Sequence, residues 1–346
     1  MTAEPGGDEI AANGRRPGGG DGWRPLADTF ALVGRLRRPL YGFSFAVSAL
    51  AAGAVGAIAA LGFALAWDAF GTLREIVARN KAAEDPPFSA TGETEPAFGL
   101  TAVLVVVLLL LLLSLVLALQ YSAHAVAVRT ALDGRGPPGA GGLWRGIRPY
   151  LARVLGIQLL MVLGVAITLV AGVDLFEALA RDLLPGITRP RSPFTGFSPL
   201  DWVAGLGLPL ITACVGPFVF IRLSLAGAAV VFEDSTAGDA LRRSWTLTRG
   251  SPARVFRAWL PITAAVALAA ALLWYAATPL ARPAGAAMMW LSGGNVHTAG
   301  TLAQHIPAAA AACVLPVVVM PPVCVLLCVL YTGLAAREGE RSRPTP

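Results

Sequence analysis

Arg222 is the residue whose type and position point most directly to chemistry. It interrupts an apolar stretch that runs from Trp202 to Phe232, and an arginine in hydrocarbon is costly unless it reaches the interface or is paired. A guanidinium binds phosphate through two parallel hydrogen bonds, so the position predicts contact with a lipid phosphate or another anionic ligand. The alternative is an arginine that ends a spanning helix at the inner interface and sets its depth.

A second group of polar residues follows the same stretch. Glu233 and Asp234 are adjacent carboxylates, which can serve general acid–base chemistry or hold a cation. Carboxylates just before a helix also bond its free backbone N–H groups, and the sequence leaves both interpretations open. Thr236 and Asp239 then form a T-x-x-D pattern, which is typical of a helix N-terminus.

The helix that this pattern opens is predicted to run to Gly250. It places Trp245 on its apolar face and Arg242, Arg243 and Arg249 on its polar face. A short basic helix with tryptophan on its apolar side is expected to lie in the plane of the membrane interface. The three arginines are therefore predicted to contact anionic headgroups. Trp144, in an earlier basic segment, is predicted to be a second interfacial anchor.

The elements that position these residues are membrane-spanning helices. The chain has 346 residues, of which 55% are hydrophobic and 14% are charged, whereas soluble domains are about a quarter charged. Apolar runs of about 20 residues can cross a bilayer. They predict an all-α polytopic bundle with amphipathic cytoplasmic helices and six spans, near 43–67, 99–123, 151–173, 202–222, 256–280 and 306–335. This composition excludes an ordinary soluble enzyme.

The regions outside the spans predict domain organisation and orientation. The six-helix membrane domain is expected over 23–339, with a disordered Gly-, Pro- and Arg-rich tail over 1–22 and a short tail over 340–346. Most of the 27 lysines and arginines lie in segments on the side of the N-terminus. Because cytoplasmic loops carry an excess of basic residues, both termini are predicted to be cytoplasmic.

Several site classes find no support in the sequence. Cys324 and Cys328 are one helical turn apart, but their apolar run offers no histidine or carboxylate, so no metal site is predicted. The chain contains no Walker loop, dinucleotide fingerprint, H-E-x-x-H or G-x-S-x-G motif, so no cofactor is expected. No basic run is interleaved with aromatic residues, which argues against nucleic acid.

Three stretches of the chain form a pattern when taken in order: RPLADTF at 24–30, RLSLA at 222–226 with ALRRSWTLTRG at 240–250, and LYTGL at 330–334. Together they resemble the membrane domain of some bacterial glycerophosphoryl diester phosphodiesterases. Glu233, Ser244, Trp245 and Gly250 belong to this signature. The resemblance implies a membrane domain in a bacterial inner membrane. It does not imply phosphodiester hydrolysis, because no segment between spans approaches the roughly 200 residues of a catalytic barrel.

These observations favour a non-enzymatic scaffold or lipid-contacting module. Its basic cytoplasmic surface is expected to engage anionic headgroups or a protein partner. A transporter or permease subunit is the alternative, because prolines such as Pro217 and Pro321 interrupt the fourth and sixth spans and discontinuous helices build substrate sites in transporters. A lipid-active membrane enzyme using Glu233 and Asp234 is the third possibility.

Overall fold

The computed structural model describes residues 25–82, 95–136, 138–180 and 206–341, and within these ranges every regular element is helical. Six segments are long and apolar enough to cross a membrane: Pro25–Leu65, Pro96–Leu132, Gly141–Leu179, Leu208–Glu233, Pro252–Leu291 and Val296–Gly339. The predicted all-α bundle with six spans is therefore confirmed. The predicted tail over 1–22 and the start of the predicted fourth span, 202–205, lie outside the described residues.

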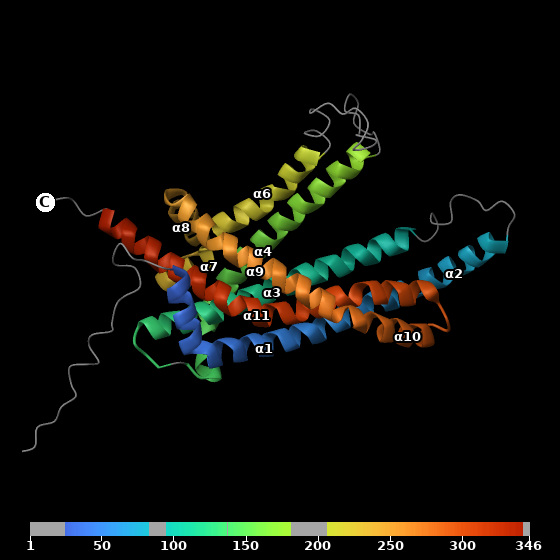
Figure 1. Ribbon diagram of the computed structural model, residues 1–346, viewed down its shortest axis with the longest axis horizontal. Helices are drawn as coiled ribbons and strands as arrows, with labels where there is room; N and C mark the ends of the chain where they lie inside the picture. Colours follow the sequence, from blue (N-terminus) through green and yellow to red (C-terminus); the bar gives the residue numbers. More distant parts are fainter. Residues whose placement is uncertain (1–24, 83–94, 137, 181–205, 342–346) are drawn as a thin grey trace, which may run out of the picture.

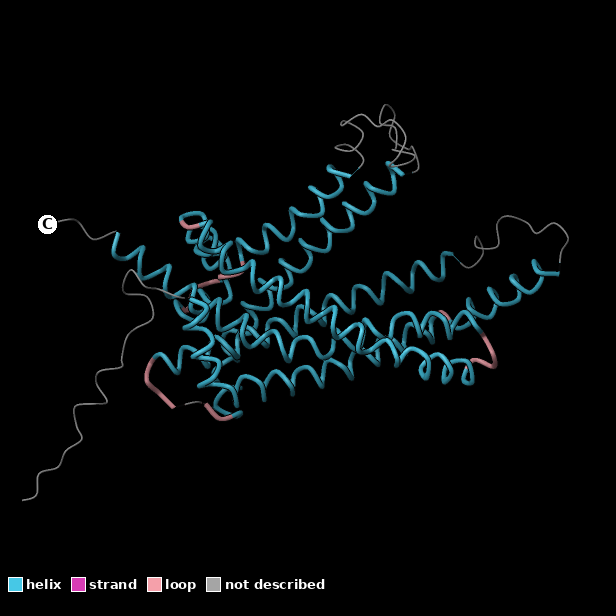
Figure 2. Tube along the Cα trace, viewed as in Figure 1, coloured by secondary structure: helices cyan, strands magenta, loops and turns pink. Residues whose placement is uncertain are grey.

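Figures 1 and 2 show how the helices are arranged. In chain order they are α1 (Pro25–Leu65), α2 (Trp67–Ala82), α3 (Glu95–Leu132), α4 (Ala140–Ala180), α6 (Leu208–Leu223), α7 (Ala226–Glu233), α8 (Ala237–Gly250), α9 (Pro252–Ala277), η3 (Thr278–Leu280), α10 (Ala281–Leu291) and α11 (Val296–Arg341). Consecutive elements build two of the spans: α6 with α7, and α9 with η3 and α10.

The amphipathic segments before the first and third spans are helical, as predicted. Each is continuous with its span, as the first part of α1 and of α4, and each joins it near an internal proline, Pro39 or Pro149. Proline removes one backbone hydrogen bond and bends a helix, and the first turns of α1 run at a steep angle to the rest (Figure 1). Among the described residues, α8 is the separate amphipathic helix.

The helices diverge from a common base. α1, α3 and α11 pack together, while α4 and α6 pack closely along each other and extend as an arm at an angle to them (Figure 1). Two glycines allow this close approach. A Cβ on Gly216 would lie 2.8 Å from the Cα of Val165, and one on Gly172 would lie 2.9 Å from the carbonyl oxygen of Pro209. Small residues at such contacts let spanning helices pack backbone to backbone.

The core lies at the base of the bundle, around α7. Every residue from Ala226 to Val231 is buried there, as is the stretch of α11 from Val323 to Tyr331. α9, in contrast, is exposed over most of its length, as expected for a helix that faces lipid. The base also carries ten exposed arginines, and we call it the basic end: Arg35, Arg37, Arg38, Arg135, Arg145, Arg148, Arg242, Arg249, Arg254 and Arg257.

Candidate functional site

Arg222 lies in the last turn of α6, where the span breaks. Ser224 and Leu225 form a turn between α6 and α7, and the Ser224 hydroxyl donates a hydrogen bond of 2.8 Å to the carbonyl oxygen of Ile221. The chain then continues as the buried helix α7, which was not predicted as a separate element. The small residues of α7 are the sequence feature that could have indicated a closely packed helix. Gly227 lies so close to Tyr121 that a Cβ would be 3.3 Å from the ring.

The guanidinium of Arg222 is held by aromatic rings. Its central carbon lies 5.3 Å from the ring centroid of Phe218 and 5.6 Å from that of Trp245, which is within the range of cation–π attraction. The Nη1 atom is buried and has no hydrogen-bond partner. Among the residues that the structure describes, no carboxylate pairs with Arg222, so its positive charge is balanced by no neighbouring side chain.

Helix α8 is fastened to the same break through the backbone of Arg222. The Ser244 hydroxyl donates to the Arg222 carbonyl oxygen at 2.8 Å. This carbonyl is one of the last in α6 and has no continuing helical turn to bond it. The Thr248 hydroxyl lies 3.2 Å from the same oxygen and 2.9 Å from the carbonyl oxygen of Ser244, and its single proton is shared between these acceptors. Ser244 therefore satisfies a helix end and fixes α8 across it, and Trp245 is thereby placed against the guanidinium.

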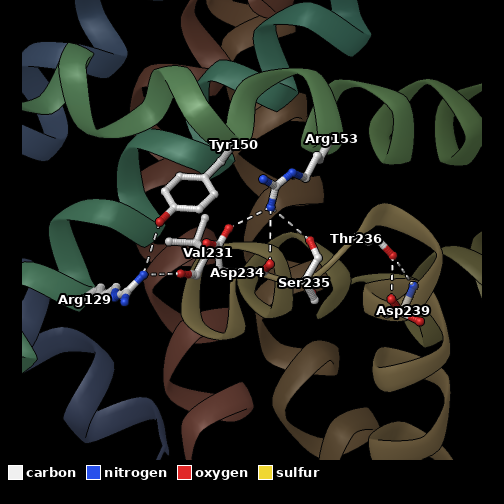
Figure 3. Close-up of polar contacts among 8 residues, drawn as sticks. All are labelled: Arg129, Tyr150, Arg153, Val231, Asp234, Ser235, Thr236 and Asp239. Atoms are coloured by element: carbon white, nitrogen blue, oxygen red, sulfur yellow. Dashed lines mark hydrogen bonds and ion pairs between the residues drawn. The ribbon is translucent and has the colours of Figure 1, made fainter.

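The start of α8 confirms the predicted cap (Figure 3). The backbone N–H of Asp239 donates to the Thr236 hydroxyl oxygen at 3.2 Å, and that hydroxyl donates to the Asp239 carboxylate at 2.6 Å. The hydrogen bond from Thr236, aided by the positive charge of Arg242, lowers the pKa of the Asp239 carboxyl. The cap therefore holds an ionised aspartate in the first turn, where the helix dipole favours it.

Arg243 is turned into the protein, where it joins three helices. Its Nε donates to Glu233 at 3.2 Å and its Nη1 donates to Glu338 of α11, while the Tyr331 hydroxyl donates to Glu233. Partial burial lowers the pKa of Arg243, but the charges of Glu338 and Glu233 outweigh this effect and raise it. Arg243 is thus engaged in ion pairs within the protein while its side chain stays 31% exposed, and its predicted contact with a headgroup remains a prediction.

The neighbouring carboxylate, Asp234, is used differently from Glu233 (Figure 3). Asp234 ends α7 in the left-handed conformation, with φ of 52°, and its carboxylate accepts from Arg153 at 2.7 Å. Arg129 donates to the carbonyl oxygen of Val231 at 2.6 Å. Arginines from α3 and α4 therefore bond the C-terminal end of α7. The two carboxylates bond different arginines and do not face each other as an acid–base pair.

The remaining predicted residues lie on the outer surface of the basic end. Arg242 is 83% exposed in its side chain and bonds only Asp239, at 2.8 Å, and Arg249 is exposed. Trp245 and Trp144 are 41% and 51% exposed, as expected of interfacial anchors. Gly250 is the last residue of α8, directly before the turn into α9.

Two further observations concern groups buried in the bundle. Cys324 and Cys328 are buried and unpaired, and the described ranges hold no cluster of three or more histidine, cysteine or carboxylate side chains fit for a metal. Ser44, Gln120 and His124 form a network that is entirely buried and was not predicted. Gln120 and His124 are one helical turn apart and share a face of α3, but nothing in the sequence indicates that Ser44 of α1 meets them.

Comparison with known proteins adds no relative: no protein-family model, curated protein or solved structure matches the chain. The fold itself defines the class. The chain has six helical segments that are long and apolar enough to span a bilayer, which is the architecture of a multi-pass integral membrane protein.

Proposed function

We propose that this protein is a lipid-contacting module of a bacterial inner membrane, which binds the headgroup of an anionic phospholipid at Arg222 and along the exposed face of α8. The bundle is oriented with its basic end in the cytoplasm, in keeping with the positive-inside rule. The likeness to the phosphodiesterase membrane domain supports the same role, because that domain carries the α8 signature without contributing a catalytic barrel.

The unbalanced charge of Arg222 carries this proposal. The guanidinium is fixed by Phe218 and Trp245 at the end of a span, and no described carboxylate pairs with it. A charge in such surroundings is stabilised by a counter-charge from outside the chain, and at the interface the abundant anion is a lipid phosphate. Arginine suits that role because its donors match phosphate oxygens in pairs.

The surroundings of Arg222 extend the same surface. Arg249 is exposed on α8, and Arg254 and Arg257 are exposed on the first turns of α9. Each basic residue near an anionic leaflet adds about 1 kcal/mol of attraction. Trp245 covers the guanidinium and remains 41% exposed, so one side chain both holds Arg222 and reaches the interface.

The test is native mass spectrometry of the protein released from its own membrane. We expect wild type to retain a mass of one or more phospholipids, and Arg222→Ala to lose most of it. Arg222→Lys keeps the charge but lacks the planar pair of donors, so it is expected to retain less than wild type. Arg282→Ala is the matched control, because it removes one exposed arginine from α10 at the opposite end.

Three outcomes would contradict the proposal. Equal lipid retention by wild type and Arg222→Ala would show that Arg222 only sets the depth of its helix at the interface. Equal loss from Arg282→Ala would indicate a general charge effect. Retention of inorganic phosphate in place of lipid would assign the site to a free anion. Circular dichroism of each variant establishes that the helices are intact.

A further inference from the structure

A hydrogen-bonded network lies inside the bundle, between α1 and α3. Ser44, Gln120 and His124 are each 0% exposed. The Ser44 hydroxyl lies 2.7 Å from Oε1 of Gln120 and 3.2 Å from Nε2 of His124, and Nδ1 of His124 contacts the backbone carbonyl oxygen of Gln120. Buried polar side chains within a membrane span are costly and mark functional positions by default.

Counting protons shows that this network has two arrangements. A backbone carbonyl only accepts, so Nδ1 of His124 carries a proton in both of them. In the neutral ring, Nε2 accepts from the Ser44 hydroxyl, which must itself accept from the amide nitrogen of Gln120. In the doubly protonated ring, Nε2 donates to Ser44, and Ser44 donates to Oε1 of Gln120. The second arrangement matches the observed orientation of the Gln120 amide.

We propose that Ser44, Gln120 and His124 form a buried proton-binding site. One proton from solvent binds Nε2 of His124, the hydrogen bonds through Ser44 reverse their direction, and the Gln120 amide turns over. No other bond forms or breaks. The site lies on α1 and α3, whereas the proposed lipid contact lies on α6 and α8. The two proposals use different residues and can therefore be tested separately.

The polar atoms around the network favour a role beyond packing. Nε2 of Gln120 is buried without a hydrogen-bond partner, and the same holds for Oγ of Ser48, Oγ of Ser122 and Oε1 of Gln158. Leaving such atoms unbonded in a core is unfavourable. A core selected only for packing would carry apolar side chains at these positions.

The titratable groups on the surrounding helices leave a charge on His124 uncompensated. α3 packs against α1, α4, α7 and α11. On α3 and α11 the other buried groups are Tyr121, Cys324, Cys328 and Tyr331, of which the first three interact with one another. The charged groups are engaged elsewhere: Arg129 bonds Val231, Arg153 bonds Asp234, Glu233 bonds Arg243 and Tyr331, and Tyr150 accepts from Arg129. The part of α1 from Gly42 to Leu65 has no titratable residue.

The test uses the small number of histidines in the chain. There are three, so the double variant His297→Asn/His305→Asn leaves His124 as the only one. The full chain is labelled with nitrogen-15 in the imidazole ring, placed in lipid nanodiscs, and followed by NMR from about pH 8 to about pH 4, the range around the ordinary histidine value. We expect Nδ1 protonated and Nε2 unprotonated at the upper end, and both protonated at the lower end.

Two serines of α1 provide a matched comparison in that background. Ser44→Ala removes the bond to Nε2, whereas Ser48→Ala removes a buried hydroxyl without a partner, one turn further along. A hydrogen bond to the charged ring is stronger than one to the neutral ring. Ser44→Ala is therefore expected to move the protonation of His124 to lower pH, and Ser48→Ala to leave it unchanged.

Each contrary result overturns the proposal. A ring that keeps one protonation state over the whole range does not bind a proton. A neutral ring protonated at Nε2 contradicts the proposed arrangement. Equal behaviour of the two serine variants shows that the network does not control the site. If Ser44→Ala does not fold, Gln120→Met replaces it, because it keeps the side-chain length and removes the second group of the network.

Discussion

The hydroxyl of Ser244 on α8 donates a hydrogen bond of 2.8 Å to the backbone carbonyl oxygen of Arg222 at the end of α6. One neutral side chain thereby joins an interfacial helix to the break in a membrane span. The guanidinium of Arg222 and the ring of Trp245 meet on the same junction. The hydrogen bond to the backbone of Arg222 and the ring over its guanidinium thus come from adjacent residues of α8.

Removing the Ser244 hydroxyl should loosen α8. Ser244→Ala leaves the Arg222 carbonyl with the longer bond from Thr248, of 3.2 Å, and a hydrogen bond of this kind contributes about 1 kcal/mol. We expect faster hydrogen–deuterium exchange across α8, measured by mass spectrometry in nanodiscs. Thr246→Ala is the control, since that exposed hydroxyl bonds only the carbonyl oxygen of Arg242 within α8. Unchanged exchange in Ser244→Ala would show that apolar packing alone holds α8.

The two adjacent arginines of α8 should differ in their effect on stability. Arg243→Gln removes the cation between Glu233 and Glu338, whereas Arg242→Gln breaks an exposed pair with Asp239. After allowance for solvent screening, we expect a loss of about 1 kcal/mol for Arg243→Gln and a smaller loss for Arg242→Gln. Thermal unfolding in detergent measures both. Combining Arg243→Gln with Glu338→Gln should cost less than the sum of the single losses.

The close contact of α4 and α6 should not tolerate an added methyl group. A Cβ on Gly216 would lie 2.1 Å from Oγ1 of Thr168 and 2.8 Å from the Cα of Val165, so Gly216→Ala forces the helices apart. We expect a loss of about 1–3 kcal/mol in unfolding by denaturing detergent. Gly156→Ala is the matched control on α4, because a Cβ there meets nothing within 4 Å. Equal stability of the two variants would contradict the packing described.

The cap of α8 should depend on pH in a defined direction. Because the Thr236 hydrogen bond lowers the pKa of Asp239 below its ordinary 3.8, its contribution to stability is present above that value and is lost as pH falls through the lowered one. NMR of the Asp239 carboxyl carbon measures the midpoint. Thr236→Val should raise it towards 3.8, while Thr246→Val on the exposed face should not. A midpoint at the ordinary value in wild type would contradict the capping interaction.

Local features of the chain were predicted correctly because they depend on neighbouring residues. Six apolar runs specify six spans through hydrophobic transfer, which acts on each segment by itself. Thr236 and Asp239 specify a cap because a helix start involves only one turn. The signature residues Ser244 and Trp245 were also predicted to be important, and both contact Arg222. The spacing of the signature does not reveal that the Ser244 hydroxyl bonds the backbone of Arg222.

The contacts between side chains of different helices could not be predicted from the sequence, because they depend on how distant helices pack. Arg243 pairs with Glu338, which lies 95 residues further along the chain, and no local pattern around Arg243 predicts that ion pair. Ser44 and His124 are 80 residues apart and become neighbours because α1 and α3 pack on those faces. Hydropathy places a helix in the membrane without determining which side it turns to each neighbour. The sequence thus determined the spans, the cap and the basic end, and the tertiary structure decided which of the charged and polar side chains bond one another and which remain available to a ligand.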